Sequence, residues 1–210
     1  THEQLVNWIL CAAIYFRGTG DRRWMTSNLP VLKKCLASML NRDHPEDSKR
    51  NGVMGLDSDR TIDGAEITTY DSLDKSLGQA RNNMYIALKG WASYLAMESI
   101  FMELACPREA ARSARQARRA ADTMTSYLNA DGFIPAILGE PCDARIIPAI
   151  EGLVFPWVLN QRTVLAERGP YGALIKALKT HFATVFQAGV CIYPDNGWKL
   201  SSSADNSWLS

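Results

Sequence analysis

Residues 84–101 read M-Y-I-A-L-K-G-W-A-S-Y-L-A-M-E-S-I-F, and this stretch decides the fold. At helical spacing its apolar side chains cover every face of the helix; they are Met84, Tyr85, Leu88, Trp91, Tyr94, Leu95, Met97, Ile100 and Phe101. A helix that is apolar all round must be enclosed by other elements. We therefore predict a buried helix from about Leu73 to Leu104.

The segments on both sides of this helix carry the periodicity of further helices. The predicted ones are 3–16, 22–42 with a bend at Pro30, the amphipathic 107–128, an apolar helix after Pro148, and the amphipathic 171–187. Buried helices that alternate with amphipathic ones, joined by long connections, describe an inner and an outer layer. The sequence thus predicts an all-α fold with the organisation of part of an α/α barrel.

Composition and charge exclude several classes of function. The chain has 210 residues, of which 47% are hydrophobic and 21% charged, with a formal net charge of +1, so no global field favours nucleic acid or an anionic membrane. Its longest apolar run, Trp8 to Phe16, is too short to span a bilayer. Five scattered cysteines without a C-x-x-C pair indicate reduced thiols in a cytoplasmic protein.

The segment before the buried helix is the place to expect chemistry. Residues 55–83 read G-L-D-S-D-R-T-I-D-G-A-E-I-T-T-Y-D-S-L-D-K-S-L-G-Q-A-R-N-N and gather six carboxylates with little apolar material among them. Such a cluster at the mouth of a helical scaffold is what a polar binding or acid/base site needs. A calcium loop is not supported, because Ile62 and Thr68 stand where an EF-hand needs Gly and Glu.

This segment and several later runs resemble the catalytic domain of family 52 glycoside hydrolases, which are retaining β-xylosidases. The similar runs are T-Y-D-S-L-D (69–74), G-V-M-G-L-D-S-D (52–59), G-Q-A-R-N-N (78–83), I-I-P-A-I-E-G-L-V-F-P (146–156), G-W-K-L-S-S (197–202) and N-S-W-L-S (206–210). Before Gly52 the similarity is looser. A similar Thr-Tyr-Asp occurs in the family 116 β-glucosidases of the same clan.

The resemblance implies an (α/α)6 barrel, of which residues 1–210 form a single domain segment, the C-terminal portion. It also implies that Asp71 is the general acid/base, that the nucleophilic Glu lies upstream of Thr1, that xylooligosaccharides are the substrate and that no metal or organic cofactor is needed. By the residues alone, a role of Asp71 or Ser72 as the cap of the following helix is favoured, and the resemblance reverses this preference. The corresponding Thr in the related β-glucosidase motif touches the sugar, so Thr69 is a candidate for the glycone subsite, against ordinary loop hydrogen bonding.

Six further residues are candidates for substrate binding: Asp57, Arg81, Asn82, Glu151, Trp198 and Lys199. Each has a structural alternative. Asp57 can form loop ion pairs, Arg81 and Asn82 can support the acid's loop, and Glu151 can interact with the dipole of an inner helix in its first turn. Trp198 and Lys199 combine an aromatic face with a donor, as sugar sites do, but Trp is also common packing material.

Two other patterns point away from chemistry. Arg108, Arg112, Arg115 and Arg119 form a row on helix 107–128, which we interpret as a solvated face or a homodimer contact rather than a polyanion site. The three histidines have no nucleophile motif around them. A helical-repeat interaction module is the alternative from another class, but we find no repeat of the period that solenoids show.

Overall fold

The structure is a computed structural model that describes residues 1–57 and 81–203. Its helices are α1 (His2–Thr19), α2 (Arg22–Asp43), η1 (Asp47–Lys49), α3 (Met84–Glu103), α4 (Pro107–Ser126), η3 (Ile147–Leu153), α5 (Val154–Val158), η4 (Arg162–Leu165) and α6 (Gly172–Val185). Extended pairing within the described ranges consists of isolated bridges. The predicted all-α class is confirmed for this part of the chain.

Helix ends follow local capping chemistry. The side chain of Thr1 accepts a hydrogen bond from the backbone N–H of Gln4, whose side chain accepts one from the Thr1 backbone, so α1 starts with a capping box. Gly20 ends α1 in the left-handed conformation, with φ of 68°. Pro107 occupies the first turn of α4, where its missing N–H costs nothing. Pro30 lies inside α2, as predicted.

The buried helix starts later than predicted. Asn82 has a φ of 54°, which no α-helix can contain, and the side chain of Asn83 accepts a hydrogen bond from the N–H of Tyr85 at 2.9 Å. This cap fixes the first residue of α3 at Met84. The prediction that the helix already runs through residues 81–83 is therefore wrong, and residues 73–80 lie outside the described ranges.

The helix predicted after Pro148 is also different. Residues Ile147–Leu153 form the 3₁₀ helix η3, and only Val154–Val158 continue as the short α-helix α5. Gly152 explains why this segment follows α3 so closely: a Cβ there would lie 2.7 Å from the carbonyl oxygen of Leu88. The backbone of η3 is thus in contact with the backbone of the buried helix.

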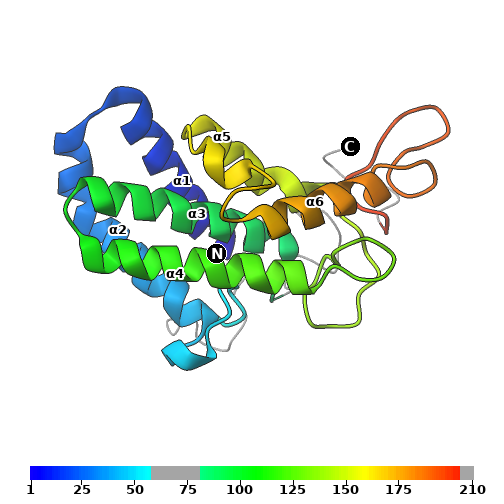
Figure 1. The fold of residues 1–210 in the computed structure, drawn as a ribbon, viewed down its shortest axis with the longest axis horizontal. Coiled ribbons are helices and arrows are strands. Elements are labelled where there is room, and N and C mark those ends of the chain that lie inside the picture. Colours follow the sequence, from blue (N-terminus) through cyan, green and yellow to red (C-terminus); the bar gives the residue numbers. More distant parts are fainter. Residues whose placement is uncertain (58–80, 204–210) are drawn as a thin grey trace.

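The elements form two layers. α3 packs against both α1 and η3, while α2, α4 and α6 lie outside them (Figure 1). Two sets of contacts fix the directions. Glu3 of α1 and Gly152 of η3 contact the first part of α3 at Tyr85 and Leu88, and Phe16 and Gln161 line one small cavity with Ile100 further along α3. The inner elements therefore run parallel, and the first turns of α1, α3 and η3 share one end of the molecule. We call it the loop end, because the connections 44–57, 81–83 and 127–146 meet there.

The predicted difference between inner and outer helices is confirmed. Every residue of α3 from Met84 to Met97 is buried. α4 buries one face, which includes Ala110, Ala117, Ala121 and Met124. Arg108 and Arg115 of its arginine row are exposed, but Arg112 and Arg119 are half-buried, and Arg119 pairs with Asp47 at 3.2 Å. The interpretation of the row as an entirely solvated face is therefore wrong for Arg119.

An apolar groove of about 610 Å³ separates the edges of α5 and α6. It is lined by Ile150, Leu153, Val154, Trp157, Leu165, Ile175, Leu178, Lys179, Phe182 and Ala183. Trp157 exposes 56% of its surface beside it. None of the helices in the described ranges combines the length and the apolar character needed to cross a membrane.

Candidate active site

The predicted acid/base, Asp71, and its neighbour Thr69 fall between residues 58 and 80 and lie outside the described residues. Both ends of that segment are described. Arg81 Nη2 lies 2.5 Å from Asp57 Oδ1, and both side chains are mostly buried, with 22% and 18% exposed. A loop ion pair was the structural alternative expected for Asp57, and such a pair is present. It brings the two ends of the acidic segment together at the loop end.

Asn82 links three segments at the same place. Its N–H donates to the carbonyl of Met54 at 3.4 Å, and its carbonyl accepts from the N–H of Leu138 at 2.9 Å. Its side-chain oxygen would lie 2.8 Å from a Cβ placed on Gly55, so the amide is packed against that glycine. These contacts correspond to the supporting role that was the alternative to sugar contact for Asn82.

Glu151 lies in η3 at the loop end and contacts a different set of partners. Its Oε1 is 3.2 Å from Nζ of Lys89, and 42% of its side chain is exposed. Lys89 itself is only 4% exposed. The favourable dipole interaction expected as the alternative for Glu151 does not account for this position, because the residue sits in the middle of a 3₁₀ helix and its carboxylate is paired with a buried ammonium.

Lys89 belongs to a polar cluster inside the inner layer, which we call the Lys89 cluster and which consists of Glu3, Tyr85, Lys89 and Glu151. Lys89 Nζ donates to the hydroxyl of Tyr85 at 2.6 Å, and that hydroxyl donates to Glu3 Oε1 at 2.7 Å. The ammonium is also 3.7 Å from Glu3 Oε1 and 4.5 Å from the centre of the Tyr85 ring. One cation thus connects α1, α3 and η3.

Sequence reasoning missed three of these four residues. Tyr85 was counted among the apolar side chains of the buried helix, and Glu3 among the boundaries of α1. A signal was available: Lys89 is the one charged residue among residues 84–97 of the sequence, and a buried cation requires counter-charges from neighbouring elements.

Trp198 and Lys199 lie on a ribbon that folds back onto the start of η3. The carbonyl of Leu200 accepts a hydrogen bond from the N–H of Ile147, and the N–H of Ser202 donates one to the carbonyl of Arg145, both at 2.9 Å. Trp198 is 48% exposed, as an aromatic platform for a sugar would be. The ammonium of Lys199, however, donates to the carbonyl of Ser202 at 3.0 Å and so has a structural partner.

Two buried groups hold the surrounding loops. The carboxylate of Asp43 accepts from the N–H of Gly52 at 2.8 Å and from Gln116 Nε2 at 2.7 Å. Burial raises the pKa of Asp43, and these hydrogen bonds oppose the rise. His181 accepts from the N–H of Ile134 through Nδ1 at 3.0 Å and has Nε2 2.9 Å from the carbonyl of Ile146, which requires the neutral ring. Burial lowers the pKa of His181 accordingly.

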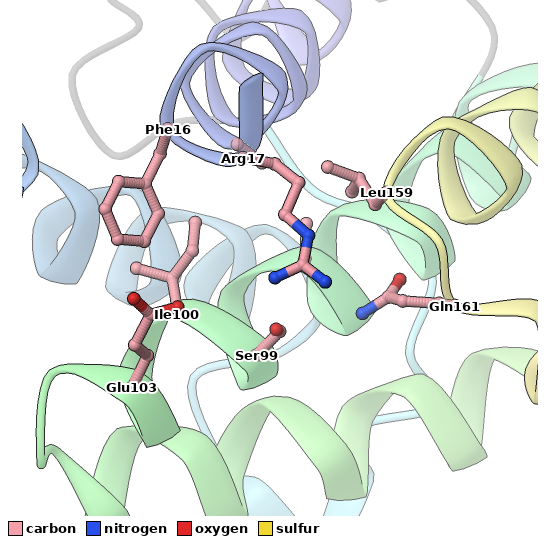
Figure 2. A pocket seen from close by; sticks show the side chains of 9 residues that line it. Phe16, Arg17, Ser99, Ile100, Glu103, Leu159 and Gln161 are labelled. Carbon is pink, nitrogen blue, oxygen red and sulfur yellow. The ribbon is translucent and has the colours of Figure 1, made fainter. Parts of the chain in front are cut away.

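A small cavity at the opposite end of the helices does not fit a sugar. Figure 2 shows the Arg17 side chain of α1 reaching into it towards Ser99 of α3 and Gln161. Its volume of about 20 Å³ holds roughly one water molecule, whereas ligand pockets have about 300–1,000 Å³. The loop end, with its paired and half-exposed polar groups, is the better candidate for an active site.

Comparison with known proteins identifies two β-xylosidases as relatives. The chain is 56% identical to a β-xylosidase from Geobacillus stearothermophilus over 210 residues, which is all of this chain and 30% of that protein. A second β-xylosidase from the same organism is 41% identical over 133 residues, or 63% of this chain and 21% of that protein. No profile of a known protein family matches the chain.

These matches confirm the resemblance to β-xylosidases. The similarity includes the residues before Gly52, where the sequence runs alone gave a looser resemblance. The chain spans less than a third of the length of either relative.

Proposed function

We propose that this chain is part of a family 52 glycoside hydrolase, a retaining β-xylosidase that releases xylose from the non-reducing ends of xylooligosaccharides. The observation that carries the proposal is the 56% identity to a β-xylosidase along the whole chain. Residues 1–210 form in this proposal the C-terminal portion of an (α/α)6 catalytic domain. The two-layered packing of α1 to α6 supports it, and so does the apolar groove between α5 and α6, which further helices of a barrel would cover.

In the proposed reaction, Asp71 first protonates the departing glycosidic oxygen. A Glu outside these 210 residues attacks the anomeric carbon and forms a xylosyl-enzyme, and Asp71 then removes a proton from the water that hydrolyses it. The two carboxyl groups of a retaining enzyme stand about 5–5.5 Å apart. The Asp57–Arg81 ion pair supports the assignment, because it joins the two ends of the segment that carries Asp71 at the loop end. No metal or organic cofactor takes part.

The reaction proposed for Asp71 is tested in the full-length enzyme. Asp71→Ala should slow hydrolysis of xylobiose about 10²–10⁴-fold, because the leaving hydroxyl then departs unprotonated. An aryl xyloside with an acidic phenol needs less protonation and should be slowed much less in its first step. Added azide should restore turnover by replacing water in the second step. Wild-type turnover of xylobiose by Asp71→Ala would refute the assignment.

The nearest competing function is that of a β-glucosidase of the same clan. The two differ in the substituent at C5 of the sugar, so the discriminating measurement is the ratio of kcat/KM for an aryl β-xyloside and the matching aryl β-glucoside. We expect the xyloside to be preferred, since both relatives are β-xylosidases. We further propose a cytoplasmic enzyme, in keeping with five cysteines that are all free.

A further inference from the structure

The Lys89 cluster is costly to keep unless it serves a purpose beyond packing. Lys89 is 4% exposed and Glu3 is 8% exposed, so both charges have lost most of their hydration. Buried ion pairs generally recover little more than this desolvation cost, and apolar residues of similar volume often replace them without loss of stability. The cluster connects three inner elements at their first turns, where the loop end begins.

The cluster has a closed side and an open side. On the closed side, Glu3 and the Tyr85 hydroxyl hold the ammonium from within the core. On the open side, Glu151 reaches the same ammonium at 3.2 Å while 42% of its side chain is exposed. The Oε1 atom of Glu151 is therefore held by a cation that Glu3 and Tyr85 hold in turn, and part of the Glu151 side chain remains exposed to solvent.

We propose that Lys89 is a positioning residue that, together with Glu3 and Tyr85, fixes Glu151 as the acceptor for hydroxyl groups of the neutral sugar. This inference rests on the proposed function and adds to it the residues that set the orientation of the acceptor. A carboxylate held in place before binding loses little freedom when a ligand arrives, so its hydrogen bonds contribute fully to affinity. The hydroxyls concerned are those away from the bond that is cleaved, which makes the contribution one to binding rather than to the chemical step.

The test compares Lys89→Met, Glu151→Gln and the double variant in the full-length enzyme, with an aryl β-xyloside as substrate. Each single change should raise KM about tenfold or more and leave kcat within about threefold, because a hydrogen bond to a charged group is lost from ground state and transition state alike. The KM of the double variant should not exceed the higher of the two single-variant KM values, because both changes remove the same interaction. Partial unfolding alone would lower the apparent kcat and leave KM unchanged.

A matched control is Lys33→Met. Lys33 pairs with Glu109 at 2.9 Å between α2 and α4 of the outer layer, and the same substitution there should leave KM unchanged. Tyr85→Phe covers the case in which Lys89→Met fails to fold, since it removes a single oxygen and keeps the ring; it should raise KM about threefold. A KM within experimental error of wild type in Tyr85→Phe and in a folded Lys89→Met, or KM effects that multiply in the double variant, would overturn the inference.

The two proposals fail separately. A wild-type enzyme that does not hydrolyse xylosides refutes the proposed function. Wild-type hydrolysis with unaltered KM in the cluster variants refutes the positioning role alone.

Discussion

α3 and α4 are neighbouring helices of twenty residues each, and they use charge in opposite ways. α3 carries one buried cation, Lys89, whose partners Glu3 and Glu151 come from two other elements. α4 carries a row of arginines, of which Arg108 is exposed. In the inner layer the charge of Lys89 is held by partners inside the fold, whereas in the outer layer Arg108 and Arg115 are exposed to solvent. Substitutions of apolar residues, glycines and titratable groups should show, through their effects on stability, how far this difference extends to other residues.

The largest effect is expected for an apolar residue of the inner helix. Phe101→Ala should lower the free energy of unfolding by about 3–5 kcal/mol, because Phe101 is completely buried and its loss leaves a cavity. Its neighbour Met102 is 63% exposed, so Met102→Ala should change the same quantity by no more than about 0.5 kcal/mol. Denaturant unfolding of the two variants measures the contrast. Equal effects would contradict the burial that distinguishes the two faces.

Replacing a glycine by alanine should change stability in opposite directions at a closely packed and at an open position. Gly152→Ala should destabilise by about 2–3 kcal/mol, because the new methyl would meet the backbone of Leu88 and push η3 away from α3. At Gly18 of α1 a methyl group would enter open space, with nothing beyond its own helix within 4 Å, so Gly18→Ala should stabilise by about 0.5–1 kcal/mol. Thermal unfolding midpoints should therefore move in opposite directions. A tolerated Gly152→Ala would show that η3 can move away from α3 at little cost.

The pH dependence of stability should report on His181, which lies on the buried side of the outer helix α6. Burial lowers the pKa of His181 below its usual 6.5, so as the pH falls the unfolded chain takes up a proton before the folded one does. The stability contributed by the neutral ring is complete above pH 6.5 and declines below it, with a slope of at most about 1.4 kcal/mol per pH unit. His181→Gln should reduce this dependence. An unchanged slope between about pH 7.5 and about pH 5 in the variant would rule out His181 as its source.

The smallest effect is expected on the wet side of α4. Arg108→Glu combined with Arg115→Glu should leave stability within about 0.5 kcal/mol and xyloside turnover within about twofold, because both residues are exposed. Arg119→Glu is the internal comparison, since it breaks the contacts with Asp47 and Gln116 and should cost more. Size-exclusion chromatography of the double variant tests the homodimer prediction: a shift towards monomer would assign the row to a subunit contact.

The layers were predictable because they depend on hydrophobic periodicity. Apolar residues on every face predicted that α3 is buried, and one apolar stripe predicted the orientation of α4. The boundaries were harder. The left-handed conformation of Asn82 and the cap formed by Asn83 prevent α3 from starting earlier, although the apolar spacing of the sequence continues across both residues. After Pro148 the chain forms η3, whose backbone approaches α3 closely at Gly152, and this is a tertiary contact that no local pattern contains.

The candidate site was likewise predictable only in part: single residues were identified, but their pairings were not. Asp57 and Arg81 are far apart in sequence, and each was identified separately as a candidate; their pairing needed the structure. Glu151 was predicted, but its partner Lys89 was not, because periodicity treats a charged residue in an apolar helix as an interruption. The physical rule that a buried ammonium needs counter-charges would have directed attention to Lys89 and to the carboxylates near it.

The Asp57–Arg81 ion pair has a consequence for how this architecture can diversify. Asp57 closes the connection after α2, and Arg81 directly precedes the residues that cap α3, so the pair fixes the place at which the chain enters the buried helix. Changes of sequence between these two positions should therefore leave the start of α3 in place as long as the ion pair forms. A protein built in this way can exchange the segment that carries its proposed acid/base without redesigning the scaffold, which makes the ion pair a natural boundary for transplanting specificity between relatives.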